Sequence, residues 1–167
     1  MALRLFRRRP RAVAGPDPAE ELRRTVSTVT VLPDDGATRA DARARLRRIV
    51  AEAVVLQDQA AELLAEVRDR EPLAELAPRG GPLASRFFEL RRQLPPPADD
   101  RMARQCATAS TVLDHHGTLI VTALQMLSMD WRSPAIVEQL ERLDGLGPPA
   151  ERLDAVYTEL AAAGAQR

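Results

Sequence analysis

Two adjacent histidines and a single cysteine are the residues in this sequence whose chemistry could support metal binding or catalysis. They are His115, His116 and Cys106. Neighbouring residues on a regular helix point about 100° apart, so His115 and His116 cannot bind one metal ion together. Helical ligands usually lie three or four residues apart, and Leu113 and Ile120 occupy those places around His116. We therefore interpret His116 as a core histidine and His115 as its surface neighbour.

Cys106 lies on the apolar side of its predicted helix, without a Cys–His motif that could activate a thiol. The Gly80-Gly81 pair lacks the lysine and the preceding strand of a phosphate-binding loop. The sequence therefore predicts a protein that is not an enzyme and that has no catalytic residue, bound metal or cofactor. A metal-binding or enzymatic bundle that uses His115 and His116 is the second alternative.

The composition favours helices over sheets. Of the 167 residues, 45 % are hydrophobic and only 3 % are aromatic, which predicts an aliphatic core. The formal net charge is zero, which argues against a nucleic-acid-binding protein. Every Lys or Arg position is Arg, as expected of a bacterial genome rich in G and C.

Two long stretches, 39–70 and 98–131, carry apolar residues at alternating spacings of three and four. This heptad spacing is typical of long amphipathic helices that pack like coiled coils. The first stripe consists of Leu46, Ile49, Ala53, Leu56, Ala60, Leu63 and Val67. The second consists of Met102, Cys106, Ala109, Leu113, His116, Ile120, Ala123 and Leu127. We predict an all-α helical bundle built on these two helices, lying antiparallel to each other.

Shorter segments complete the predicted bundle. Prolines and glycines in 71–82 predict a loop, and a helix is expected over 83–94. Further helices are expected over 134–144 and 149–163. Either these helices or a second copy of the chain would cover the apolar flanks of the long helices.

The N-terminal part of the chain gives weaker signals. We predict a disordered basic tail over 1–16 and a single helical domain over 17–167. Residues 25–31 are rich in β-branched side chains and fit either a short helix or a strand.

The first long helix carries its charges in an order that its dipole disfavours. Arg39, Arg43, Arg45, Arg47 and Arg48 cluster near its N-terminus, and Glu62 and Glu66 lie in its C-terminal half. Ordinary solvated charge explains this pattern equally well. The alternative is that two copies pair antiparallel, with Arg45 of one facing Glu66 of the other. These seven residues are therefore candidate interaction residues.

Two further features concern partners and location. Leu3, Leu5, Phe6, Arg7, Arg8 and Arg9 are candidate contacts to an anionic surface, although a solvated tail is favoured. Trp131 would either seal the end of the core or anchor a partner. The basic start has no apolar segment behind it, and no apolar run reaches the length of a membrane span. Together with the single cysteine, this predicts a cytoplasmic protein without a membrane partner.

The expected function follows from the lack of a catalytic or metal-binding motif and from the apolar faces of the predicted helices. We expect a non-enzymatic helical interaction module, such as an adaptor, assembly or regulatory accessory protein, which self-associates or binds a partner protein. The first alternative is a nucleic-acid-binding regulator that uses the Arg39–Arg48 cluster and the N-terminal tail.

Overall fold

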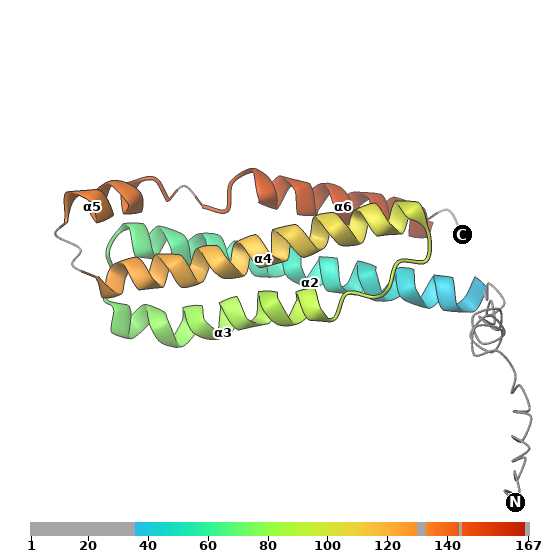
Figure 1. Ribbon diagram of the computed structural model, residues 1–167, viewed down its shortest axis with the longest axis horizontal. Coiled ribbons are helices and arrows are strands. Elements are labelled where there is room, and N and C mark those ends of the chain that lie inside the picture. The colour runs from blue at the N-terminus through green and yellow to red at the C-terminus, as the bar shows by residue number, and fades with distance from the viewer. Residues whose placement is uncertain (1–35, 130–132, 144, 166–167) are drawn as a thin grey trace, which may run out of the picture. The chain divides into compact units, whose positions relative to one another are not determined.

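The computed structural model describes residues 36–129, 133–143 and 145–165. Within these ranges the regular structure consists of five helices and no strand, which confirms the all-α class for this part of the chain (Figure 1). The helices are α2 (Gly36–Arg68), α3 (Leu73–Arg92), α4 (Asp100–Ser128), α5 (Pro134–Glu141) and α6 (Pro148–Ala165).

The apolar stripes predicted for the two long helices form the centre of the core. Leu46 and Val67, near the ends of the α2 stripe, are fully buried, as are Leu113 and Ile120 in α4. Of the two stripes, Leu56, Cys106 and Leu127 are only half-buried, and all other members are buried. The stripes are buried because a spacing of three and four residues keeps them on one side of each helix.

The prediction of a loop over 71–82 is wrong, because α3 already begins at Leu73. Pro78 and Pro82 lie inside the helix, where each removes a backbone donor, and both face solvent. The helix persists because Leu76 and Gly80 continue the buried stripe of this segment toward its N-terminus. The stripe consists of Leu76, Gly80, Leu83, Ala84, Phe87 and Leu90.

The prediction that the two long helices lie antiparallel is also wrong. Because α3 is a helix that runs back along the bundle, the chain reverses twice, and α2 and α4 run in the same direction (Figure 1). The side chains agree: Arg43 near the start of α2 pairs with Asp99 at the start of α4. Near the middle of both helices, Gln57 Nε2 lies 3.2 Å from His116 Nε2.

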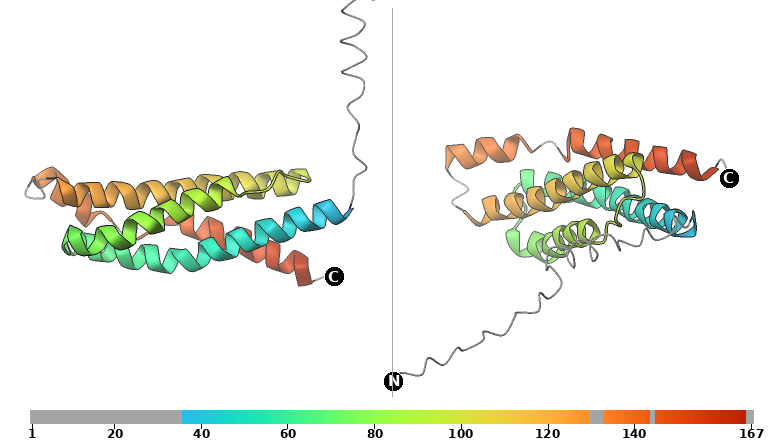
Figure 2. Two further views of the ribbon diagram at one scale, coloured as in Figure 1. Left: turned by 90° about the horizontal axis from the view of Figure 1, so that it is seen from below. Right: turned by 45° about the vertical axis from the view of Figure 1, so that its right-hand side comes forward.

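Helices α2 and α4 form the middle of the bundle, with α3 on one side and α5 and α6 on the other (Figures 1 and 2). Helices α3 and α4 approach closely at two glycines. A Cβ atom at Gly117 would lie 2.7 Å from the Phe88 ring, and one at Gly80 would lie 2.7 Å from Leu124 Cδ1. A larger residue at either position would therefore force a neighbouring side chain to move.

The chain's own helices cover the apolar flanks of α2 and α4, so a second copy is not needed for this purpose. Leu140 of α5 and Leu153 of α6 are fully buried against the core. Among the described residues, the large apolar side chains that remain exposed are Val55, Val121 and Met129. Three such side chains are too few to form a large apolar patch.

Several predictions lie outside the described residues. They concern the tail over 1–16, the domain boundary at residue 17, the alternatives for 25–31, and Trp131. They remain predictions.

Candidate interaction site at the basic end of the bundle

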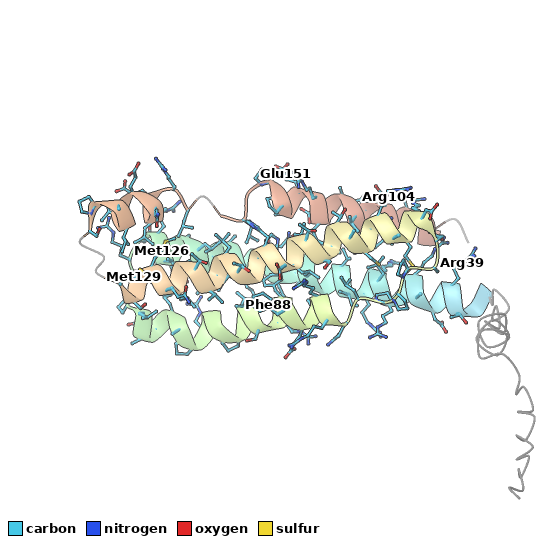
Figure 3. The ribbon with its side chains drawn as sticks, viewed as in Figure 1. Arg39, Phe88, Arg104, Met126, Met129 and Glu151 are labelled. Atoms are coloured by element: carbon cyan, nitrogen blue, oxygen red, sulfur yellow. The ribbon has the colours of Figure 1, made fainter. Side chains whose placement is uncertain are left out.

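Arginines of two helices gather at one end of the bundle, where α2 and α4 begin. Figure 1 shows these two helix starts at the same end, whereas α3 ends farther along the bundle. Figure 3 shows Arg39 and Arg104 at this end. We name it the basic end and define it by Arg39, Arg43, Arg45, Arg47, Arg48, Arg101 and Arg104. The acidic residues of this end are Asp41, Asp99, Asp100 and Glu159. Arginine therefore outnumbers acid there.

The opposite end has the reverse balance. Its acidic residues are Glu62, Glu66, Asp69, Glu71, Glu75, Glu138 and Glu141, and its arginines are Arg68, Arg70, Arg79 and Arg142. We name it the acidic end. The zero net charge of the sequence therefore conceals a separation of charge along the bundle.

Helix α6 runs opposite to α2, so its C-terminal end lies at the basic end (Figure 1). The electronegative carbonyl groups of that end partly offset the positive end of the α2 dipole. Helix α4 begins at the same end and adds a second positive dipole end. The charge order of α2 is therefore unfavourable for its dipole.

Arg43 holds the start of α4 in place. It pairs with Asp99, whose Oδ1 also accepts a hydrogen bond from the Met102 backbone nitrogen at 2.8 Å. Asp99 thereby caps the N-terminus of α4. The hydrogen bond from Met102, followed by that from Arg43, lowers the pKa of the Asp99 carboxyl, and the charge of Arg39 acts in the same direction. Arg43 thus has a structural role.

Arg45, Arg47 and Arg48 differ from Arg43. Of the predicted arginine cluster, these three are exposed and have no ion-pair partner in the part of the chain that the structure describes.

The predicted acidic partners lie at the acidic end, and one of them is already paired. Glu66 accepts two hydrogen bonds from Arg79, at 2.8 and 3.0 Å. These bonds raise the pKa of Arg79, as does the charge of Glu62 to a smaller extent. Glu62 itself is exposed. Arg79 was missed from the sequence because it falls in the segment predicted as a loop.

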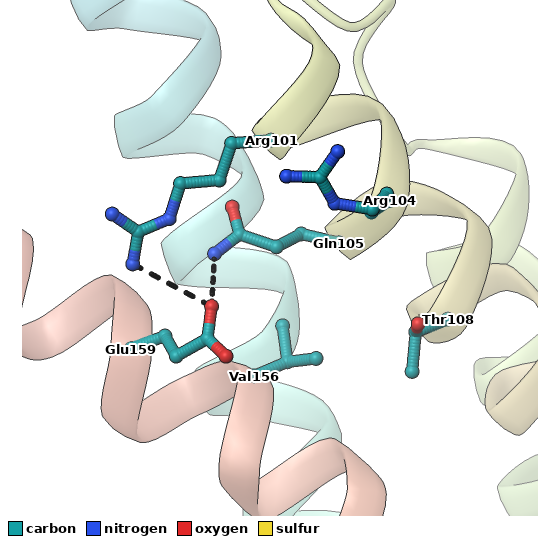
Figure 4. A pocket seen from close by; sticks show the side chains of 6 residues that line it. All are labelled: Arg101, Arg104, Gln105, Thr108, Val156 and Glu159. Atoms are coloured by element: carbon teal, nitrogen blue, oxygen red, sulfur yellow. Dashed lines mark hydrogen bonds and ion pairs between the residues drawn. The ribbon is translucent and has the colours of Figure 1, made fainter.

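A cleft opens at the basic end between α4 and α6 (Figure 4). It has a volume of about 590 Å³. Arg101, Arg104, Gln105 and Thr108 line it from α4, and Val156 and Glu159 line it from α6. The Glu159 carboxylate accepts a hydrogen bond from Gln105 Nε2 at 2.9 Å and lies 3.5 Å from an Arg101 nitrogen. None of these residues was singled out from the sequence.

The two histidines lie as predicted, with His116 fully buried and His115 exposed. Gln57 joins three helices here, since its Nε2 also donates to the Ala150 carbonyl of α6 at 3.3 Å. The Phe87 ring meets the His116 ring edge-on, with centroids 5.4 Å apart. Burial, followed by the neighbouring charge of His115, lowers the pKa of His116 to about 4. His116 is therefore a neutral core residue at pH 7.

Cys106 is half-buried, with Sγ 3.7 Å from the Pro95 carbonyl oxygen. Burial raises the pKa of its thiol, which disfavours the nucleophilic thiolate. In the part of the chain that the structure describes, no group of three or more His, Cys, Asp or Glu side chains could hold a metal ion. None of the described helices is both long and apolar enough to cross a membrane.

The remaining candidate residues fall outside the described ranges. They are Leu3, Leu5, Phe6, Arg7, Arg8, Arg9 and Trp131.

The described residues thus define an all-α bundle with an aliphatic core and a basic end. Comparisons of the chain with protein-family models, with curated proteins and with solved structures found no match.

Proposed function

We propose that the protein is a non-enzymatic interaction module that binds an acidic segment of a partner protein at its basic end. The observation that carries this proposal is the exposure of Arg45, Arg47 and Arg48, without ion-pair partners among the described residues. Guanidinium groups bind carboxylates through paired, charge-assisted hydrogen bonds. Such arginines are frequent in protein interfaces.

An apolar docking surface is less well supported than a charged one. Most of the apolar surface of its helices is buried within the chain, so an apolar docking face gains no support. Asp41, Asp99, Asp100 and Glu159 lie among the arginines of the basic end, and they would repel a continuous phosphate backbone. An acidic peptide can place its carboxylates between these acids, so a protein partner is favoured over nucleic acid.

Titration calorimetry with a short poly-glutamate peptide tests the proposal. We expect binding that weakens with added salt, because the contacts are electrostatic. Replacing Arg45, Arg47 and Arg48 together by Gln should weaken it by at least about tenfold, or ~1.4 kcal/mol. The matched control replaces Arg68, Arg70 and Arg142 at the acidic end and should leave the affinity within about twofold.

Duplex DNA serves as the competing probe. If DNA binds with a steep salt dependence and the peptide does not bind, the nucleic-acid alternative replaces this proposal. If both triple variants weaken peptide binding equally, the basic end has no special role and the proposal is wrong.

A second copy of the chain is itself a suitable partner for the basic end, because its acidic end presents an acidic surface. We propose that self-association, where it occurs, joins the basic end of one copy to the acidic end of another. Light scattering over a range of protein and salt concentrations tests this: the mass should rise with concentration and fall with salt. A constant monomer mass would leave a different protein as the partner.

The proposed location of the protein is the cytoplasm.

A further inference from the structure

The cleft between α4 and α6 is lined by hydrogen-bond donors that outnumber its acceptors. Arg101, Arg104, Gln105 and Thr108 are spaced so that they form one stripe along α4. Two guanidinium groups, an amide and a hydroxyl therefore line the same cleft. Figure 4 shows Arg101 and Gln105 directed toward Glu159, whereas Arg104 and Thr108 lie farther from this carboxylate. Glu159 is the one carboxylate in the lining of the cleft.

Glu159 does not satisfy these donors. It accepts one hydrogen bond from Gln105, and its contact with Arg101 is long, at 3.5 Å. Arg104 and Thr108 donate no side-chain hydrogen bond to a residue that the structure describes. An acceptor from outside the chain could therefore bind Arg104 and Thr108 without breaking an existing bond. If this acceptor is a carboxylate, the cleft then holds two carboxylates, because Glu159 already lies beside Arg101.

We propose that this cleft receives a carboxylate side chain of the acidic segment, with Arg104 and Thr108 as its ligands and Arg101 shared between that carboxylate and Glu159. This inference rests on the proposed function and names the place where one acidic residue of the partner is held. Gln105 and Arg101 already hold the Glu159 carboxylate, so donors in the lining of this cleft bind a carboxylate.

Three substitutions test the cleft in the titration with the poly-glutamate peptide. Arg104→Gln should weaken binding by about five- to tenfold, because it removes a charge-assisted hydrogen bond. Glu159→Gln should strengthen binding by about threefold or more, since it removes the negative charge that competes for the same donors. The matched control is Arg152→Gln on α6, an exposed arginine outside the cleft, which should change the affinity by less than about twofold.

The outcomes separate this inference from the proposed function. If the peptide binds and only the α2 triple variant weakens it, the proposed function holds and the cleft inference is wrong. Equal effects of Arg104→Gln and Arg152→Gln, or weaker binding by Glu159→Gln, would also overturn the cleft. No binding of the peptide by the wild-type protein overturns both. Unchanged melting temperatures of the variants would show that the loss of affinity is not caused by unfolding. Arg104→Lys keeps the positive charge and should therefore restore part of the affinity that Arg104→Gln loses.

Discussion

The polar groups at the centre of the bundle and those at its basic end are used in opposite ways. At the centre, Gln57 connects His116 of α4 to the Ala150 carbonyl of α6, and both side chains are buried. At the basic end, Arg45 and Arg104 project from the surface without ion-pair partners among the described residues. The residue type most often linked to catalysis is structural here, and ordinary arginines are the candidates for function.

This difference follows from the balance of donors and acceptors. A buried polar group costs free energy unless it is hydrogen-bonded, so the contact between Gln57 and His116 Nε2 favours one packing arrangement. His116 Nδ1 is buried without a hydrogen-bond partner among the described residues. Exposed guanidinium groups are hydrated and add little to stability, so they remain available for a partner. Substitutions at the centre should therefore change folding, whereas substitutions at the basic end should change binding.

The largest effect is expected for Leu113→Asp in the middle of α4. Leu113 is fully buried, so the substitution places a carboxylate in the aliphatic core without a partner. We expect a loss of at least about 4 kcal/mol of stability, enough to unfold a typical domain. Circular dichroism should show loss of helicity at 25 °C.

Val55→Asp is the matched control, because Val55 is 64 % exposed on α2. It should change stability by less than about 0.5 kcal/mol. A Leu113→Asp variant that keeps its helicity and melting temperature would contradict the assignment of the core.

The next largest effect is a loss of stability at acid pH through His116. Its pKa is about 4 in the folded protein, against 6.5 for an ordinary histidine, so the unfolded chain binds the proton first as the pH falls. Its stabilising contribution is complete above pH 6.5 and is lost progressively down to pH 4. The full loss amounts to about 3 kcal/mol.

Urea unfolding at pH 7 and at pH 4.5 measures this contribution. His116→Leu should lose less stability between the two pH values than the wild type does. His115→Gln should lose only slightly less than the wild type, because it removes the smaller of the two causes that lower the pKa of His116. The prediction fails if His116→Leu and the wild type lose the same free energy, since carboxylates would then account for the whole change.

The sequence predicts the fold where one periodic pattern decides it and fails where two signals compete. The stripes through Leu46 and Leu113 are regular, and the structure buries them. In α3, Pro78 and Pro82 indicated a loop, and this signal decided the prediction. The structure shows a helix instead, because burial of the stripe through Leu76 and Gly80 favours it. That one error also changed the predicted direction of α4, because it removed a reversal of the chain.

The candidate site was predicted only in part, for a different reason. The Arg45–Arg48 cluster is local and visible in the sequence. The cleft requires Arg104 and Glu159 to come together from helices far apart in the sequence, and no local pattern predicts which helices become neighbours. Gln57 was missed in the same way, because its partners lie on α4 and α6.

A smaller effect on stability is expected at the one place where the basic end has a structural role. Asp99→Ala removes the cap of α4 and the partner of Arg43. We expect a decrease in melting temperature of about 3–5 °C. Asp100→Ala is the control, since Asp100 is exposed and makes no capping bond, and it should shift the melting temperature less. Equal shifts for the two variants would show that the cap is not the cause.

The smallest effect on stability is expected for the joint replacement of Arg45, Arg47 and Arg48 by Gln. The three side chains are exposed and unpaired among the described residues, so the melting temperature should change by less than about 2 °C. It should rise slightly at low salt, because the substitutions relieve repulsion among like charges and remove cations from the positive end of the α2 dipole. Differential scanning calorimetry at low and high salt measures both effects. A large decrease would mean that these arginines hold the bundle together, and the division between a structural centre and a binding end would no longer stand.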